Sequence, residues 1–173
     1  MEIGDAETER FVSLSPIGYQ FPDITDDPWD ANWLIIRGTA RTDDEEWTFE
    51  DPAMLVHEAA ALGVWLHNVG AGRATLIGED EDSHAWSNTQ NLEPNIGLGL
   101  VRSTEDSATL RVFLWIESGP PSVRRLNPDD MNFSFDLTTS RAAIERAAEE
   151  WDAELVKFPE RGPLPLVTLS ARS

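Results

Sequence analysis

Carboxylates are the only abundant reactive side chains in this sequence, and their spacing specifies no catalytic site. Two carboxylates could catalyse glycoside hydrolysis, and an oxygen-rich loop could bind Ca²⁺. The closest approach to a cation loop is formed by Asp23, Asp26, Asp27 and Asp30, but two prolines interrupt it and its spacing differs from an EF-hand. With 32 acidic residues in the chain, some pair will always look suggestive. We therefore predict no catalytic residues and no metal site.

The three histidines also lack a recognisable motif. His57 and His67 are ten residues apart in a predicted helix, which places them about 80° apart around its axis. They lack the four-residue spacing of a helical metal pair, and His84 follows an acidic run. No H-E-x-x-H, G-x-S-x-G or P-loop occurs, and the absence of Cys excludes disulfides and thiolate ligands. We expect exposed, solvated histidines, no cofactor and no enzymatic activity.

The negative charge is the feature that most needs an explanation. Thirteen Lys and Arg oppose 32 Asp and Glu, giving a formal net charge of −19 over 173 residues. Such a charge destabilises a compact chain by self-repulsion, and solubility alone requires much less. A cationic partner would explain it. The acids gather in segments 23–30, 43–46, 79–82 and 149–154.

Tryptophans accompany several of these acidic segments. Trp33 and Trp47 occur in predicted strands and are expected in the core, whereas Trp29 and Trp86 fall in loops. Acids around exposed aromatics would suit a basic protein surface, because charge steers the encounter and aromatics supply binding energy. Segments 23–30 and 43–46 flank one strand and its hairpin turn, so we expect them to lie close together. The candidate partner-binding residues are Asp26, Asp27, Trp29, Asp30, Asp43, Asp44, Glu45 and Glu46.

The elements that must position these residues are read from hydrophobic periodicity. Strands are predicted at 11–21 (an edge or bent strand), 33–40, 46–49, 74–77, 92–101, 107–117 and 131–137. One helix is predicted over 52–68, with Asp51 as its cap and Gly70 as its stop, and another over 141–157, capped by Thr139 or Ser140. The helices do not alternate with the strands. We therefore predict an α+β fold, a curved antiparallel β-sheet of about six or seven strands with two α-helices packed on it.

The chain is expected to form one domain over residues 1–173. Residues 1–10 read as a frayed lead and 160–173 as a loose tail, although 166–169 could add a strand. The N-terminus lacks an apolar signal core, and no stretch approaches the roughly 20 apolar residues that span a bilayer. An acidic surface is repelled by anionic lipid and by phosphates. We expect an intracellular protein that binds neither membrane nor nucleic acid directly.

Several short segments resemble the WapI family of bacterial immunity proteins. They are Ile17-Gly18-Tyr19-Gln20-Phe21-Pro22, Asp30-Ala31-Asn32-Trp33-Leu34, Trp47-Thr48-Phe49-Glu50-Asp51-Pro52 and Leu92-Glu93-Pro94-Asn95. The helix carrying Leu55, Glu58, Leu62 and Trp65-Leu66 is similar too, as is the closing helix through Trp151 to Phe158-Pro159. The likeness spans most of the chain, in order. It departs before Glu58, where Val56-His57 stand in place of an expected Thr.

The resemblance implies a cytoplasmic antitoxin that acts by binding. Such a protein would neutralise the C-terminal toxin domain of a WapA-like protein, often a nuclease, and no catalytic residues carry over. A basic toxin domain is the partner that the charge also favours. Two alternatives remain open: a carboxylate-dependent hydrolase or carbohydrate-binding module that stacks sugars on loop tryptophans, and an adaptor whose charge serves solubility or adaptation to salt. The first needs a cleft with two carboxyls at a working separation.

Overall fold

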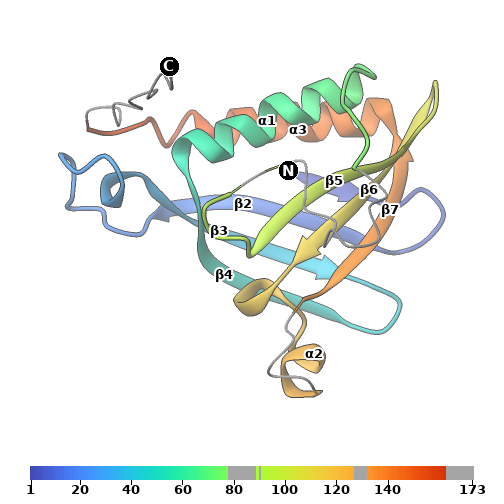
Figure 1. The fold of residues 1–173 in the computed structure, drawn as a ribbon, viewed down its shortest axis with the longest axis horizontal. Coiled ribbons are helices and arrows are strands. Elements are labelled where there is room, and N and C mark those ends of the chain that lie inside the picture. Colours follow the sequence, from blue (N-terminus) through green and yellow to red (C-terminus); the bar gives the residue numbers. More distant parts are fainter. Residues whose placement is uncertain (78–88, 90, 127–131, 163–173) are drawn as a thin grey trace, which may run out of the picture.

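The described strands of the protein form two antiparallel sheets (Figure 1). The structure is a computed structural model that describes residues 1–77, 89, 91–126 and 132–162. The first sheet has the order β1 (Glu2–Gly4), β2 (Phe11–Tyr19), β3 (Trp33–Arg41) and β4 (Glu46–Leu55). The second has the order β5 (Ile96–Ser103), β6 (Ser107–Leu114) and β7 (Ser134–Ser140). The α+β class is confirmed, with two sheets in place of the single curved one.

The two sheets are joined along one pair of edges, β1 and β7. The backbone N–H of Ala6 donates to the carbonyl of Thr138 at 2.8 Å, and the N–H of Thr138 donates to Asp5 Oδ2 at 2.7 Å. Burial raises the pKa of Asp5, but the hydrogen bonds that its carboxylate accepts from the backbone N–H groups of Thr138, Glu7 and Thr8 outweigh burial and lower this pKa. The N-terminal strand therefore links the sheets.

Two long helices, α1 (Val56–Gly70) and α3 (Arg141–Leu155), lie side by side across the sheets (Figure 1). Trp151 of α3 is fully buried, and its indole N–H donates to the carbonyl of Ala59 in α1 at 2.7 Å. Ser140 caps α3, since its Oγ accepts the N–H of Ala143. The shorter helices are α2 (Pro121–Leu126) and the 3₁₀ turns η1 (Asp30–Asn32) and η2 (Ile116–Ser118).

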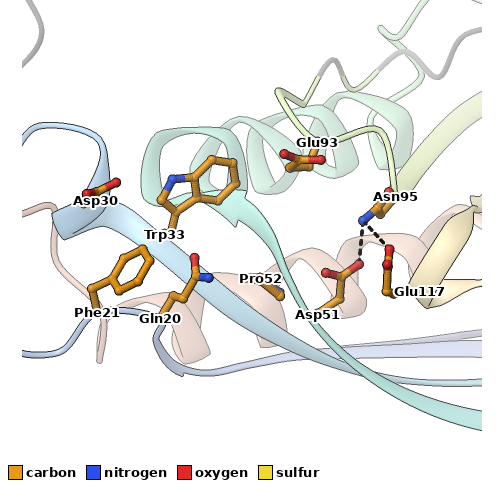
Figure 2. Close-up of a pocket in the computed structure, with 9 residues that line it drawn as sticks. All are labelled: Gln20, Phe21, Asp30, Trp33, Asp51, Pro52, Glu93, Asn95 and Glu117. Carbon is orange, nitrogen blue, oxygen red and sulfur yellow. Dashed lines mark hydrogen bonds between the residues drawn. The ribbon is translucent and has the colours of Figure 1, made fainter.

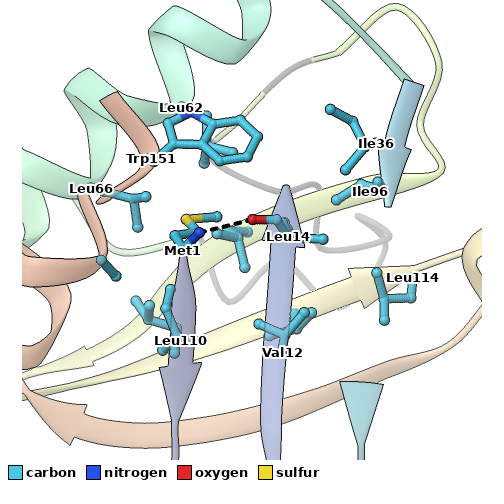
Figure 3. Close-up of a cluster of buried hydrophobic side chains, with 14 of the residues drawn as sticks. Met1, Val12, Leu14, Ile36, Leu62, Leu66, Ile96, Leu110, Leu114 and Trp151 are labelled. Carbon is cyan, nitrogen blue, oxygen red and sulfur yellow. Dashed lines mark hydrogen bonds between the residues drawn. The ribbon is translucent and has the colours of Figure 1, made fainter. Parts of the chain in front are cut away.

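The core draws apolar side chains from both sheets and both long helices (Figure 3). The strands supply them by alternation, as in β2, where Val12 and Leu14 are buried between half-buried neighbours. Met1 is part of this core, and its amino group donates to the carbonyl of Leu14 at 2.9 Å. The expectation of a frayed lead is therefore wrong for residues 1–4, because Met1 and Ile3 bury apolar side chains that a loose lead would expose.

Of three further expectations about the elements, one is confirmed in part, one is wrong and one falls outside the described residues. β2 is bent, with a register shift between Pro16 and Gly18, but β1 and β3 flank it, so it is not an edge strand. Residues 74–77 form no strand, and only Ile77 donates a backbone hydrogen bond toward β5, to Leu100. The predicted tail from 163 onward, including the optional strand at 166–169, lies outside the described residues.

The first long helix begins later than predicted, because β4 continues through Asp51-Pro52. Asp51 pairs with Ile36 of β3 and lies on the same buried face as Trp47 and Phe49. Pro52 falls at a register shift in this ladder, where a missing N–H is tolerated. Asp51 is therefore a buried strand residue and not a helix cap. The predicted stop at Gly70 is confirmed.

Candidate functional site

The structure separates the candidate partner-binding residues into two groups. The loop group, Asp26, Asp27, Trp29 and Asp30, precedes β3, and the turn group, Asp43, Asp44, Glu45 and Glu46, follows it. Strand β3 runs from Trp33 to Arg41, so the groups lie about 26 Å apart at roughly 3.3 Å per residue. Figure 1 shows the loop before β3 and the β3–β4 turn at opposite ends of the first sheet. The expected convergence of these acidic segments is wrong, because a strand of this length holds them apart.

Nearby arginines pair with two of the four acids in the turn group. Asp43 accepts a bidentate pair of hydrogen bonds from Arg10, which lowers the pKa of Asp43. Glu46 pairs with Arg41 at 2.5 Å, and Glu45 accepts a hydrogen bond from Ser122. A small cleft of about 280 Å³ lies beside these residues, with Phe133 and Phe135 in its wall. The turn group is thus partly neutralised.

The negative charge of the loop group is not neutralised locally, since none of its three acids forms an ion pair with a described residue. Asp27 Oδ1 accepts the backbone N–H groups of Trp29 and Asp30 at 2.8 and 2.7 Å, which fixes the turn into η1. Trp29 is 46% exposed, a large indole held on a surface loop. Asp26 and Asp30 are exposed beside it. An exposed aromatic among carboxylates that lack ion pairs with described residues is the kind of arrangement that the sequence analysis associates with a basic partner.

The loop group is held by the residues that follow α3. The guanidinium of Arg161 donates to the carbonyl of Ala31 from Nε at 2.8 Å and from Nη2 at 2.6 Å. It also donates to the carbonyls of Pro22 and Phe21 at 3.0 and 3.2 Å, and it lies 3.5 Å over the ring of Tyr19. The predicted loose tail therefore begins too early, because residue 161 is a structural anchor.

Asn32 completes this anchor through a reciprocal pair of hydrogen bonds. Its Nδ2 donates to the carbonyl of Arg161 at 2.7 Å, and its Oδ1 accepts the N–H of Arg161 at 2.8 Å. Asn32 is buried, so its side of both bonds is shielded from water. The loop before β3 is thus tied to a segment 129 residues away in sequence.

A cleft of about 520 Å³ adjoins the loop group (Figure 2). Its aromatic end has Phe21 and Trp33, with Asp30 beside them, and Figure 2 shows Asp51, Asn95 and Glu117 together at the other end. Gln20, Pro52 and Glu93 complete the described lining. Trp33, expected in the core, is only half-buried and forms part of this wall, whereas Trp47 is buried as expected. Trp86 lies outside the described residues.

A hydrogen-bond network builds the polar end of the cleft. Asp51 Oδ2 accepts from Asn95 Nδ2 at 2.8 Å and from Ser118 Oγ at 3.0 Å, and Asn95 Nδ2 is also 3.4 Å from Glu117 Oε2. The indole N–H of Trp47 donates to the carbonyl of Ser118 at 2.9 Å, so η2 is fastened to β4. Two carboxylates, those of Asp51 and Glu117, therefore share one amide nitrogen.

Strand β4 and two short segments bring these distant residues together. Glu58 at the start of α1 accepts the N–H of Leu55 at 2.8 Å and the N–H of Leu92 at 2.6 Å, which places the chain before β5 against the helix. Ile116 has a φ of 51°, a conformation that β-branched residues rarely adopt, and Glu117 follows it directly in η2. Such strain is often found where a side chain must be aimed for function.

Sequence reasoning missed most of the cleft, although one signal for it was present. Trp47, Phe49 and Asp51 alternate on one face, and extending that period by one step would have placed Asp51 in the strand. Nothing local indicated that Asn95 and Glu117 would meet Asp51, since these residues are 44 and 66 positions further along the chain.

His67 is not the free, solvated histidine that was predicted. Its Nε2 lies 2.9 Å from Asp152 Oδ2 and its Nδ1 lies 2.7 Å from Glu145 Oε1, so it bridges α1 and α3. The carboxylates of Asp152 and Glu145 accept hydrogen bonds from the protonated ring, which raises the pKa of His67. His57 is exposed as expected, and His84 lies outside the described residues. This bridge is structural and stands apart from the cleft.

Neither a metal centre nor a membrane span is found in the part of the chain that the structure describes. No three His, Asp or Glu side chains among the described residues converge closely enough to hold a metal ion. None of the described helices combines the length and the apolar character that crossing a bilayer requires.

Comparison with known proteins identifies the family. The immunity protein WapI-like family matches residues 3–159. This range includes both long helices and all the described strands, except for the first residue of β1. The chain therefore belongs to the immunity protein WapI-like family. No curated protein and no solved structure matches the chain. Family membership supports an immunity role, in which the protein binds a toxin partner.

Proposed function

We propose that this protein is a cytoplasmic antitoxin that binds and neutralises the C-terminal toxin domain of a WapA-like polymorphic toxin. The observation that carries the proposal is the family match over residues 3–159. We further propose that the toxin domain is a basic nuclease. A net charge of −19 favours a cationic partner, and an acidic inhibitor can occupy the surface with which a nuclease grips phosphates.

The docking surface proposed here is the loop group together with the adjoining cleft. The three acids of the loop group have no ion pair among the described residues, so their field is available to a partner. Trp29 provides a large exposed aromatic at the same place, of the type that dominates binding energy in protein interfaces. The turn group is proposed as peripheral, because local partners already engage Asp43, Glu45 and Glu46.

The mechanism would be occlusion. Long-range charge speeds the encounter, and contact between the aromatic loop and the toxin blocks the toxin's active site or a surface next to it. Such binding is stoichiometric, requires no cofactor and consumes no substrate. It also involves no direct contact between the antitoxin and nucleic acid or membrane.

A pull-down from the native host tests this function. The tagged protein is the bait, mass spectrometry is the readout, and a charge-matched unrelated acidic protein is the control. Recovery of a basic toxin C-terminal domain, whose nuclease activity the pure protein abolishes at a one-to-one ratio, is the expected result. Recovery of no such domain from cells that express the toxin would contradict the proposal.

A second candidate is a carbohydrate-binding or carboxylate-dependent hydrolase domain. The observation that favours it is the cleft, where Asp51 and Glu117 approach one amide nitrogen and Trp33 provides a face for a sugar ring. Hydrolysis would require one carboxyl to act as acid and the other as base or nucleophile. A screen of oligosaccharides by tryptophan fluorescence and by product formation distinguishes this candidate from an antitoxin.

A further inference from the structure

The cleft carries a local excess of negative charge that its own walls do not balance. Its described lining includes four carboxylates, Asp30, Asp51, Glu93 and Glu117, and no Lys, Arg or His. Three of these carboxylates belong to exposed residues, but Asp51 is only 5% exposed. The cleft therefore differs from the turn group, where arginines lie against the acids.

Asp51 is a buried carboxylate without a counter-charge. It accepts hydrogen bonds from two neutral groups, the amide of Asn95 and the hydroxyl of Ser118, and no ion pair among the described residues includes it. Burying an unpaired charge is costly, and proteins usually compensate it with an opposite charge. A cation supplied from outside the chain would do so.

Asn95 gives an independent indication at the same end of the cleft. It is only 5% exposed, and its Oδ1 has no hydrogen-bond partner within the described chain. Its Nδ2 lies 2.8 Å from Asp51 Oδ2 and 3.4 Å from Glu117 Oε2, and because carboxylates only accept, this amide orientation leaves the oxygen as the orphan. Buried polar atoms are rarely left unpaired unless a ligand or water completes them. Among the described residues, the oxygen of Asn95 thus lacks a donor, and the carboxylate of Asp51 lacks a cation.

The shape of the site favours an extended organic cation over a metal ion. No three acids among the described residues converge on one point, as a metal ion would need. The aromatic end, with Trp33 and Phe21, suits the apolar stem of a basic side chain and can face a guanidinium. Arginine fits better than lysine, since its planar head offers five donors to carboxylates at several angles.

We propose that this cleft receives an arginine side chain presented by the protein partner. The proposal deepens the function given above and rests on it, because the partner is taken to be the toxin domain. The stem would lie along Trp33 and Pro52, and the guanidinium would reach the carboxylates of Asp51 and Glu117 beside Asn95. The cleft would then supply an anchor next to the loop group.

A peptide titration tests the cleft without the toxin. Acetyl-Gly-Arg-Gly-amide is titrated into the ¹⁵N-labelled protein, and the Trp33 indole and Asn95 side-chain amide signals are followed by NMR. The control peptide replaces arginine with citrulline, which has nearly the same shape but no charge. Saturable shifts at Trp33 and Asn95 with the arginine peptide, at millimolar concentrations, and at least fivefold weaker binding of the citrulline peptide are expected.

Surface variants make the test specific to the cleft. Glu93→Gln and Glu117→Gln each should weaken peptide binding at least threefold, and together they should weaken toxin capture about tenfold. Glu149→Gln on the exposed face of α3 removes the same charge elsewhere and should leave both unchanged. Asp51 is not substituted, because its loss would disturb the fold.

The outcomes separate this inference from the proposed function. Equal binding of the two peptides, or shifts spread over all acidic surfaces, would overturn the arginine site. Toxin capture that survives the double variant would also overturn it, while leaving the antitoxin function intact. A cleft that binds the arginine peptide while no toxin is captured would uphold the site and contradict the antitoxin function. Saturable shifts with an oligosaccharide alone would overturn both.

Discussion

Replacing Arg161 should loosen the candidate docking loop from a position outside it. The Arg161→Met variant keeps a flexible apolar stem but removes every donor that the guanidinium presents to the carbonyls of Phe21, Pro22 and Ala31. Ala31 is fully buried, so its carbonyl would lose its shielded partner. The stacking of the guanidinium over Tyr19 is lost at the same time.

The magnitude follows from these contacts. A hydrogen bond from a charged donor contributes about 1.5–3 kcal/mol, and an exposed cation–π contact adds about 0.5–1 kcal/mol. Water can replace the two bonds to Phe21 and Pro22, which are exposed, so we count chiefly the bond to Ala31. The free energy of local opening should then fall by about 2 kcal/mol, or about 30-fold in the opening constant.

Native-state hydrogen exchange measures this opening directly. The amides of Gln20, Ala31 and Asn32, which bond within or beside the loop, should exchange about 30-fold faster in Arg161→Met. The control is Arg146→Met on α3, whose exposed guanidinium contacts only the carbonyl of Ala142 among the described residues. Unchanged protection in the loop, or an equal loss throughout β5 and β6, would refute the reasoning.

Two further predictions concern stability. His67 has a raised pKa in the folded protein because of Asp152 and Glu145, so its bridge stabilises most below about pH 6.5 and is lost as pH rises through the raised value. His67→Gln should remove this pH dependence of stability, which is worth under about 1 kcal/mol for a surface pair. The control His57→Gln, at an exposed histidine, should leave the dependence unchanged. Urea midpoints measured between pH 5 and 8 that move in parallel for both variants would contradict this prediction. Gly38→Ala should destabilise by about 1–3 kcal/mol in urea, because the new Cβ would fall within 2.1 Å of the Phe49 ring, and an unchanged midpoint would show that the ring moves freely.

Much of the fold could be predicted from the sequence because periodicity is a local signal. The apolar segment predicted as a strand at 33–40 and the segment predicted as a helix over 141–157 each describe one element, and each element was found there. Asp51 shows where the same reasoning fails. An Asp-Pro pair is a good helix start in isolation, but the ladder with β3 extends the strand past it.

The candidate site could be predicted only in part. The loop group was proposed from composition, since acids and Trp29 occur together in one short segment, and the structure shows that Trp29 is exposed. Its separation from the turn group was missed, because adjacency in sequence does not give the direction of the intervening strand. The anchoring by Arg161 and the meeting of Asp51 with Asn95 are long-range contacts that no local pattern encodes.

The central claim, that the loop group is the docking surface for a basic toxin domain, is tested most directly by association rates. Two triple variants remove equal charge, one through Asp26→Asn, Asp27→Asn and Asp30→Asn, the other through Asp43→Asn, Asp44→Asn and Glu46→Gln. The Debye length is about 8 Å at physiological salt, so groups about 26 Å apart act separately. The loop variant should lower the association rate constant with the toxin about tenfold and the turn variant less than twofold. Equal losses, or a larger loss in the turn variant, would contradict the account.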